Sequence, residues 1–378
     1  MNVYLDNAAT TPLHPEALEE MRIFLTENFG NPSSIHAHGR KARAAVEMAR
    51  KKTAELMSCA PGEIIFTSGG TEADNAILCG AIEKYAISHL ITSPAEHHAV
   101  LHTLRRYSKK LTLDFVKLDE KGNADMDDLE KQLKKSPALV SLMYGNNEIG
   151  NLLDVQRVGE LCRQHNAYFH CDAVQAVGHF PMSFSNTGIH GAAASAHKFH
   201  GPKGIGFMYI NKEKKIPPFM TGGAQEREMR GGTENVSGII GLAKALELSC
   251  VNMEKHRQHI LSLKKRMIDL LKEKIDGVSF NGESENMEKS LYTVLSVSLP
   301  PSPKNDMLLF QLDLQGVSAS GGSACSSGAA SGSHVIQAVY PNSERTAIRF
   351  SFSCFNTQEE IDFAAEKLAN ILATEKAS

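Results

Sequence analysis

Short apolar runs rich in β-branched residues alternate with longer amphipathic stretches along the first two thirds of the chain. The strand-like runs cover residues 63–67, 89–92, 111–116, 138–143 and 167–171. Apolar positions with helical spacing lie between them, at residues 97–107, 125–135 and 154–165. This alternation is typical of βαβ units and predicts an α/β fold around a mostly parallel sheet. Because such sheets bind ligands at the carboxyl ends of their strands, we expect the chemistry to lie in the loops there.

The pattern changes after about residue 235. A long helical tract with one break covers residues 236–275, and residues 291–299 alternate like a half-buried strand. Further helical patterns cover residues 305–314, 333–339 and 357–372, and residues 346–352 form a strand-like run. These elements indicate a smaller α+β domain. We therefore expect a large domain of residues 15–255 and a small domain made of residues 1–14 and 256–378.

Composition and charge narrow the class of protein. The chain has 378 residues, of which 42% are hydrophobic and 22% charged. Its 40 Lys and Arg residues nearly balance 43 Asp and Glu residues, so the net charge is −3. This balance argues against direct binding of nucleic acid or an anionic membrane, because neither could rely on bulk attraction. An apolar run of about 18 residues and a secretory signal are also absent from the sequence, so we expect a cytoplasmic protein.

The cysteines and histidines do not follow metal-binding patterns. The 7 cysteines stand at positions 59, 79, 162, 171, 250, 325 and 354, with no C-x-x-C spacing, and we interpret most of them as reduced thiols. The 16 histidines include no H-E-x-x-H motif, so we expect no metal site. The strict glycine-rich signatures of Rossmann and P-loop nucleotide sites are absent too, which disfavours both classes.

Two residues at predicted strand ends could serve a cofactor. Lys198 stands between a run of small residues, 191–194, and a turn-rich stretch, 199–204. A lysine held there is a candidate for a Schiff base, although a lone lysine in such a loop is far more often an ordinary surface lysine. Asp172 directly follows the strand 167–171, where its carboxylate could pair with a cationic ring nitrogen or merely cap the next turn.

Two glycine-rich segments add to this set. In residues 67–75 a strand runs into Ser-Gly-Gly and then a helix, which is suited to holding an anion, although Thr71 and Asp74 also fit a plain helix N-cap pattern. Residues 321–332 contain almost only Gly, Ala and Ser around Cys325, which predicts a mobile loop with either an idle or a reactive thiol. A lysine, an acid, an anion cradle and a thiol are consistent with one reaction.

With these residues in place, the chain resembles the cysteine desulfurases, the NifS/IscS-like group in class V of the fold-type I pyridoxal-phosphate enzymes. The matching motifs appear in family order along nearly the whole chain: residues 4–12 (YLDNAATTP), 29–33 (FGNPS), 67–72 (TSGGTE), 96–97 (EH), 146–150 (NNEIG), 172–175 (DAVQ), 195–198 (SAHK), 201–204 (GPKG), 230–234 (RGGTE), 322–325 (GSAC) and 348–350 (IRF). The resemblance implies a large, mostly parallel sheet of the seven-stranded type beside a smaller α+β domain.

The same resemblance implies roles for individual residues toward pyridoxal 5'-phosphate. Lys198 would hold the cofactor and move protons, with Asp172 on the ring nitrogen, Gln175 on the ring oxygen and His97 stacked on the ring. The phosphate would be held by Gly70, Thr71, Ser195 and His197, and by Thr233 of a neighbouring subunit, which implies a homodimer. Asn147 and Arg349 would bind the substrate carboxylate. Asn147 would also belong to the cofactor site.

The reaction implied by the resemblance removes sulfur from L-cysteine, leaving L-alanine and a persulfide on Cys325. The sulfur would then pass to an iron–sulfur scaffold protein or another acceptor. Selenocysteine lyase and a class V aminotransferase remain alternatives, since both would use Lys198 and Asp172 without needing the thiol. A sulfur carrier without turnover is a further alternative from another class.

Overall fold

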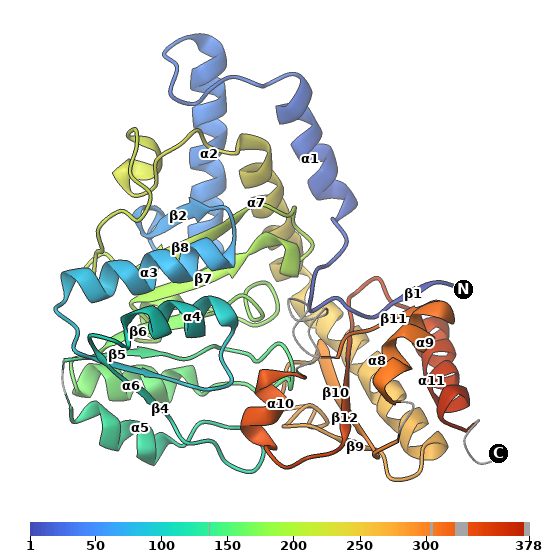
Figure 1. Cartoon of the computed structure of the whole chain (residues 1–378). Coiled ribbons are helices and arrows are strands. Elements are labelled where there is room, and N and C mark those ends of the chain that lie inside the picture. Colours follow the sequence, from blue (N-terminus) through green and yellow to red (C-terminus); the bar gives the residue numbers. More distant parts are fainter. Residues whose placement is uncertain (136, 303–304, 322–331, 374–378) are drawn as a thin grey trace.

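The computed structural model describes residues 1–135, 137–302, 305–321 and 332–373. Cys325, its predicted loop and its predicted role as sulfur acceptor lie outside these residues. The described chain folds around two main sheets, one large and central, one small (Figure 1).

The large sheet has seven strands in the order β2-β8-β7-β6-β5-β3-β4. Their bounds in that order are Ile64–Thr67, Gly206–Ile210, Gly191–Ser195, Tyr168–Asp172, Ala138–Ser141, His89–Thr92 and Thr112–Phe115. Both pairings of β8 are antiparallel, and the pairings among the strands from β7 to β4 are parallel. The predicted α/β fold with a mostly parallel, seven-stranded sheet is confirmed.

Helices cover both faces of this sheet. Successive side chains on a strand point to opposite faces, and because both sets are apolar here, both faces must be buried. Leu139 of β5 packs in one hydrophobic cluster with α3 (Gly70–Lys84) and α4 (His98–Tyr107). The next residue, Val140, packs in another cluster, on the opposite face. Five helices contribute to that second cluster: α1 (Pro15–Thr26), α2 (Ala37–Leu56), α5 (Met126–Leu133), α6 (Val155–Gln164) and α7 (Val236–Val251). The sheet is therefore buried between two helical layers.

The smaller part of the chain has its own sheet and core. Strand β10 (Val294–Leu299) pairs antiparallel with β12 (Thr346–Ser351) and β9 (Ser279–Phe280), and β1 (Val3–Tyr4) pairs parallel with β11 (Val317–Ser318). The helices of this part are α8 (Met253–Lys274), α9 (Leu308–Leu314), α10 (His334–Val339) and α11 (Gln358–Ala373). A separate hydrophobic cluster joins β1, β10 and β12 to α8 and α11.

The long helical tract expected at residues 236–275 is two helices, α7 and α8, which meet at Asn252 with a bend of 73°. Since each part has its own sheet and its own core, we propose that residues 15–255 form one domain and residues 1–14 with 256–378 the other. The remaining elements are short 3₁₀ helices at Pro61–Glu63, Phe184–Asn186, Ala196–Lys198, Gln225–Glu228 and Asn305–Met307.

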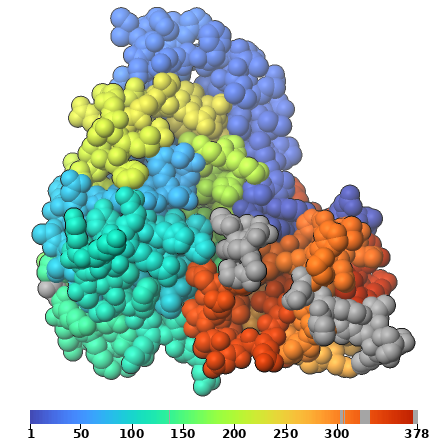
Figure 2. All heavy atoms as spheres, in the orientation of Figure 1, coloured from blue at the N-terminus to red at the C-terminus, as the bar shows by residue number. Residues whose placement is uncertain are grey.

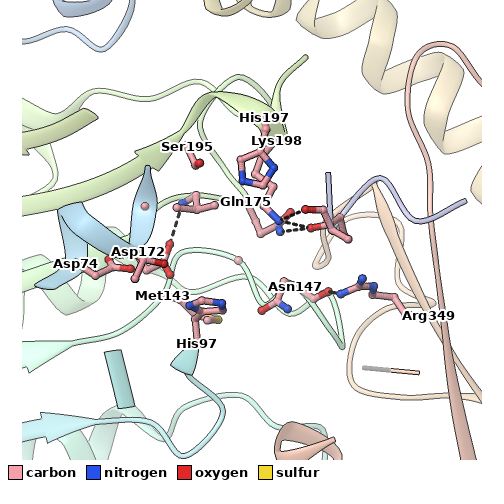
Figure 3. A pocket seen from close by; sticks show the side chains of 16 residues that line it. Asp74, His97, Met143, Asn147, Asp172, Gln175, Ser195, His197, Lys198 and Arg349 are labelled. Carbon is pink, nitrogen blue, oxygen red and sulfur yellow. Dashed lines mark hydrogen bonds between the residues drawn. The ribbon is translucent and has the colours of Figure 1, made fainter. Parts of the chain in front are cut away.

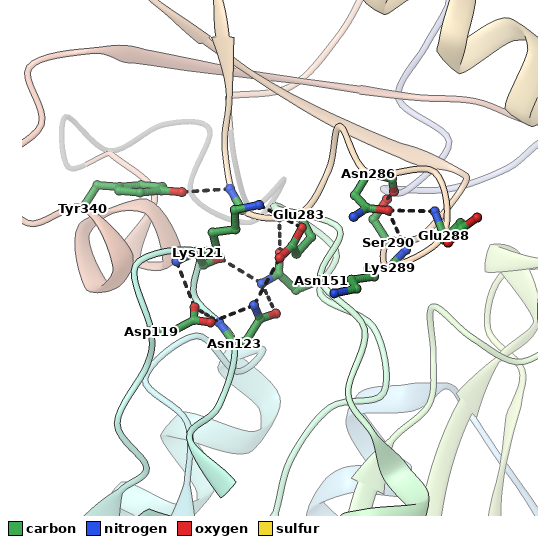
Figure 4. A network of polar contacts seen from close by, with 11 residues as sticks. Asp119, Lys121, Asn123, Asn151, Glu283, Asn286, Glu288, Lys289, Ser290 and Tyr340 are labelled. Atoms are coloured by element: carbon green, nitrogen blue, oxygen red, sulfur yellow. Dashed lines mark hydrogen bonds and ion pairs between the residues drawn. The ribbon is translucent and has the colours of Figure 1, made fainter.

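A polar network joins the two parts beside the sheet (Figure 4). The Asn151 side chain donates to the Lys121 carbonyl (2.9 Å) and to Asn123 Oδ1 (2.8 Å), and it accepts from the Glu283 backbone N–H (2.8 Å). Tyr340, which follows α10, accepts from the Gly282 N–H (2.9 Å). In Figure 2, the red-orange residues around α10 lie against the teal surface of the large part. The network fixes the loop at residues 146–151 between the two cores.

No helix within the described ranges has both the length and the apolar composition of a membrane span. The bent pair of α7 and α8 passes that test only when its two helices are taken together, by length and composition alone.

Candidate active site

A cavity of about 240 Å³ opens at the carboxyl ends of β6 and β7, facing β12 and the N-terminal segment (Figure 3). It is lined by most of the residues that the sequence analysis selected: Gly70, Thr71, His97, Asn147, Asp172, Gln175, Ser195, His197, Lys198 and Arg349. The lining also includes Ala8, Ala9, Asp74, Met143, Gly145 and Val174. Residues from seven separate motifs therefore meet in one place, while their individual roles remain predictions.

Lys198 ends the 3₁₀ helix that directly follows β7. The small residues of β7 let this strand pack closely: a side chain at Gly191 would come within 2.5 Å of Ile77 on α3. The Lys198 ammonium donates to the carbonyls of Ala8 (2.5 Å) and Ala9 (2.8 Å) from the N-terminal segment. These contacts hold the amine inside the cavity, which is where a Schiff-base lysine must stand.

Asp172 is the last residue of β6, as predicted from the strand pattern. Its Oδ1 accepts a hydrogen bond from the Val174 N–H (3.0 Å), which turns the carboxyl group into the cavity. Burial raises the pKa of Asp172 to about 6; the nearby Asp74 raises it too, while His97 opposes the shift. A cationic group placed against this carboxyl would favour its ionised form.

His97 stands at the N-cap of α4, where its Nδ1 accepts from the Ala99 N–H (3.1 Å). Burial lowers the pKa of His97 and so favours the neutral ring, in which Nδ1 accepts this bond. This N-cap bond fixes the ring beside Met143 in the cavity (Figure 3). A flat, oriented ring is suited to stacking on a planar cofactor.

The end of the cavity near Ser195 and His197 is built for an anion. Helix α3 begins at Gly70, and its first backbone N–H groups have no partner within the helix. Gly69, with φ of 154°, and Gly70 let the backbone approach closely, since a side chain at Gly70 would lie 2.6 Å from Val174. His197 bonds Thr10 Oγ1 through Nδ1 (3.1 Å), and burial lowers the pKa of His197 to about 4.

The opposite end carries an arginine. Arg349, on β12, donates through Nη1 to the Asn147 carbonyl (2.9 Å) and through Nη2 to Asp6 Oδ1 (2.6 Å). Its side chain is only 2% exposed, and its Nε has no hydrogen-bond partner among the described residues. A buried guanidinium with an unused donor is suited to bind the carboxylate of a small substrate.

Gln175 and Thr233 differ from the other expected residues in their contacts or position. Gln175 lines the cavity, as expected. Its amide nitrogen, which would serve the ring oxygen of the cofactor, donates to the Ala8 carbonyl (3.0 Å) in this structure. Thr233 lines a different cavity of about 190 Å³, together with Thr67, Ser68 and Arg230. That position is compatible with the expectation that Thr233 serves a neighbouring subunit. Cys325 lies outside the described residues.

The sequence analysis missed several residues of the cavity. The N-cap pattern assigned to Thr71 and Asp74 is wrong: the N-cap of α3 is Gly69, and Asp74 is buried at the cavity wall. Ala8 and Ala9 contribute through their carbonyls, which side-chain chemistry does not reveal, although they belong to the matching motif at residues 4–12. Glu96 is a further buried carboxyl beside the cavity, accepting from the Met143 N–H (2.6 Å).

The donor set fits pyridoxal phosphate. The cavity offers backbone N–H groups and His197 for a phosphate, the buried acid Asp172 for a ring nitrogen, and Lys198 for a Schiff base. One ligand atom from each of Asp74, His97 and Asp172 lies within 4.8 Å of the other two. We assign this group to the cofactor ring, because the anion cradle and Lys198 in the same cavity match the rest of that cofactor.

Comparisons with known proteins identify the family of this chain. The chain matches the aminotransferase class-V family over residues 3–363. It is 42% identical to the cysteine desulfurase IscS of Dictyoglomus turgidum, over 98% of this chain and 94% of that protein. It is 41% identical to the putative cysteine desulfurase IscS 1 of Bacillus subtilis, over 98% of each.

Solved structures show the same fold. A NifS-like protein superposes with a TM-score of 0.91 at 36% identity, covering 99% of this chain and 100% of that one. A structure of SspA in complex with cysteine has a TM-score of 0.81 at 27% identity, covering 94% of this chain and 100% of that one. Similarity over nearly the full length, on the fold described above, shows that this chain belongs to the aminotransferase class-V family, in the group that contains its cysteine desulfurase relatives.

Proposed function

We propose that this protein is a pyridoxal-phosphate-dependent cysteine desulfurase, which converts L-cysteine to L-alanine and keeps the sulfur as a persulfide on Cys325. The observation that supports it best is that Lys198, Asp172 and Arg349 line one cavity. The curated relatives named as cysteine desulfurases, and the SspA structure that holds cysteine, support the choice of substrate.

When bound, pyridoxal phosphate supplies an electron sink that makes the hydrogen on the substrate α-carbon acidic. Asp172 and Gln175 would hold its ring, with His97 against the ring face. Gly70, Thr71, Ser195 and His197 would hold its phosphate, and Asn147 would lie beside the ring and the substrate.

The chain's own groups perform the remaining tasks. Arg349 and Asn147 orient the substrate by its carboxylate, so that the α-carbon faces Lys198. The carbonyls of Ala8 and Ala9 hold Lys198 Nζ in place, and this nitrogen then moves a proton from the α-carbon. Cys325, as a thiolate, attacks the substrate sulfur, so that a sulfur–sulfur bond forms as the carbon–sulfur bond breaks. The carbon left behind takes up protons and is released as alanine.

The wider setting follows from the same proposal. The protein would act in the cytoplasm as a homodimer, with Thr233 of each subunit reaching the phosphate of the other. The persulfide would deliver sulfur to an iron–sulfur scaffold protein or to another acceptor, without direct contact with nucleic acid or membrane. We propose no metal site.

The direct test is release of alanine from L-cysteine by the purified protein loaded with pyridoxal phosphate. A reductant is added to clear the persulfide. We expect alanine and sulfide in equal amounts from the wild type. The Cys325→Ser variant should keep the visible absorption of the cofactor but release no sulfide, and Lys198→Ala should lose the covalently held cofactor.

A coloured protein that releases no alanine from cysteine would contradict the proposed substrate. Release of alanine from selenocysteine alone would indicate a selenocysteine lyase. Amino transfer to a keto acid, unaffected by Cys325→Ser, would indicate an aminotransferase.

A further inference from the structure

Two acids, not one, face the position expected for the cofactor ring. Asp172 ends β6, and Asp74 lies on the first turns of α3, 1% exposed. Figure 3 shows the two carboxyl groups side by side, with His97 below them. Because a single ring nitrogen can satisfy only one carboxylate, the second acid needs its own explanation.

Behind Asp74 a short polar row runs into the sheet. His170 Nε2 lies 3.2 Å from Asp74 Oδ1, and His170 Nδ1 lies 2.8 Å from Ser141 Oγ. All three residues are essentially inaccessible to solvent. Neither Asp74 Oδ1 nor His170 Nε2 has a hydrogen-bond partner among the described residues, so the two atoms lie close without the alignment of a hydrogen bond. No described donor therefore stabilises a negative charge on Asp74 Oδ1.

The surroundings distinguish the two acids. Asp172 accepts a backbone N–H, which stabilises a negative charge, whereas Asp74 faces an imidazole. Burial raises the pKa of Asp74 to about 8, above that of Asp172, and lowers the pKa of His170 to about 4. The titratable groups recorded around Asp74 are His97, Glu96, His170, Cys171 and Asp172. Two buried like charges this close cannot both be ionised, so one proton must remain in the group.

We propose that Asp74 is a positioning residue that stays protonated beside a neutral His170, and so leaves Asp172 as the single anion facing the cofactor ring. This inference rests on the proposed function for the presence of the cofactor. Asp74 acts indirectly, through Asp172. As a neutral acid it completes the wall of the cavity without placing a second negative charge beside the Asp172 carboxylate. A second anion there would compete for the ring cation and change its proton affinity.

Infrared spectroscopy of the cofactor-loaded full chain tests the proton directly. The difference between the wild type and Asp74→Asn should contain the carbonyl stretch of a protonated carboxylic acid, with no loss of carboxylate bands. The matched control is Glu96→Gln, which removes another buried carboxyl and should give a separate band. Should Asp74→Asn fail to fold, His170→Gln serves instead, and the Asp74 band should then shift in frequency.

A spectroscopic titration gives a second readout that a purely structural role would not predict. The visible absorption of the bound cofactor should titrate in Asp74→Asn within about half a pH unit of the wild type, because the neutral amide copies the neutral acid. Asp172→Asn, which removes the anion itself, should move the midpoint by more than about one unit.

Each failure is distinguishable. Loss of carboxylate bands in Asp74→Asn, or a shift of its midpoint by a full unit, would overturn this inference while leaving the desulfurase proposal intact. A wild-type protein that stays colourless with pyridoxal phosphate would overturn the proposed function, and this inference with it.

Discussion

At the scale of single residues, the acid at the end of β6 makes cofactor binding depend on pH. Burial raises the pKa of Asp172 to about 6 when no cation faces it. A cationic ring stabilises the carboxylate and lowers that pKa in the complex. Binding therefore requires the loss of a proton below about pH 6 and none above it.

We predict that the affinity of the cofactor-free protein for pyridoxal phosphate falls by up to about tenfold per pH unit below pH 6 and is flat between pH 6.5 and 7.5. Equilibrium dialysis at several pH values measures it. Asp172→Asn is the control. The titration of the free cofactor affects both proteins equally, so the ratio of their two affinities reports the ionisation of the Asp172 carboxyl alone. A ratio that does not change with pH would contradict the assignment of Asp172.

A second prediction concerns a buried ion pair that holds a strained segment. Arg50 donates from both terminal nitrogens to the Glu226 carboxylate (2.7 and 2.8 Å), and the side chains are 2% and 3% exposed. Glu226 begins three successive residues with positive φ, at 45°, 57° and 65°. Only a strong contact can hold such a backbone, and this segment leads to Thr233.

Glu226→Gln should lower the free energy of unfolding by about 3 kcal/mol, since it leaves the buried guanidinium with only the half-exposed Glu47 carboxylate (3.1 Å from Arg50 Nε) as counter-charge. Urea unfolding measures the change. Glu19→Gln removes an exposed ion pair with Arg22 and should cost less than about 1 kcal/mol. Equal losses in the two variants would mean that the burial of the Glu226 pair has no energetic consequence.

At the scale of elements, close packing of α6 against the loop that follows the 3₁₀ helix Phe184–Asn186 depends on one glycine. A side chain at Gly159 would lie 1.8 Å from the Thr187 carbonyl oxygen, a backbone atom that cannot move alone. Alanine is the better helix former by about 1 kcal/mol, yet the clash should outweigh that gain.

We therefore predict that Gly159→Ala lowers the melting temperature by several degrees, corresponding to about 1–3 kcal/mol. Gly332→Ala, where no atom of the described residues lies within 4 Å of the added atom, is the control and should leave the melting temperature nearly unchanged. A Gly159→Ala variant more stable than the wild type would show that helix propensity prevails and that α6 can shift outward.

The elements also show what sequence reasoning could and could not find. Asp172 is predictable because it follows a strand with a clear apolar pattern, and Lys198 because it follows a run of small residues that suits a tightly packed strand; strand ends of a parallel sheet meet at one edge. Asp74 was misread, since the same spacing fits a helix N-cap and a side chain facing inward. The pair of Arg50 and Glu226 joins residues 176 positions apart, and only tertiary packing brings them together.

At the scale of the whole molecule, the position of Thr233 makes a prediction about assembly. Thr233 lies outside the main cavity of its own chain, in a second cavity beside the end of β2. If Thr233 completes the phosphate site of a partner subunit, as proposed, then neither subunit is fully active alone. Two different inactive chains should then be able to restore one another.

Mixed dimers of Lys198→Ala and Thr233→Ala chains test this arrangement. Each mixed dimer contains one site with an intact lysine from one chain and an intact threonine from the other. After unfolding and refolding together in equal amounts, the mixture should show about a quarter of wild-type alanine release, since half of the dimers are mixed and each has one complete site. Replacing the first chain by one with both substitutions removes the threonine and should abolish the rescue. Activity no higher than the sum of the two parents, or a wild type that sediments as a monomer, would mean that Thr233 does not act across a subunit boundary.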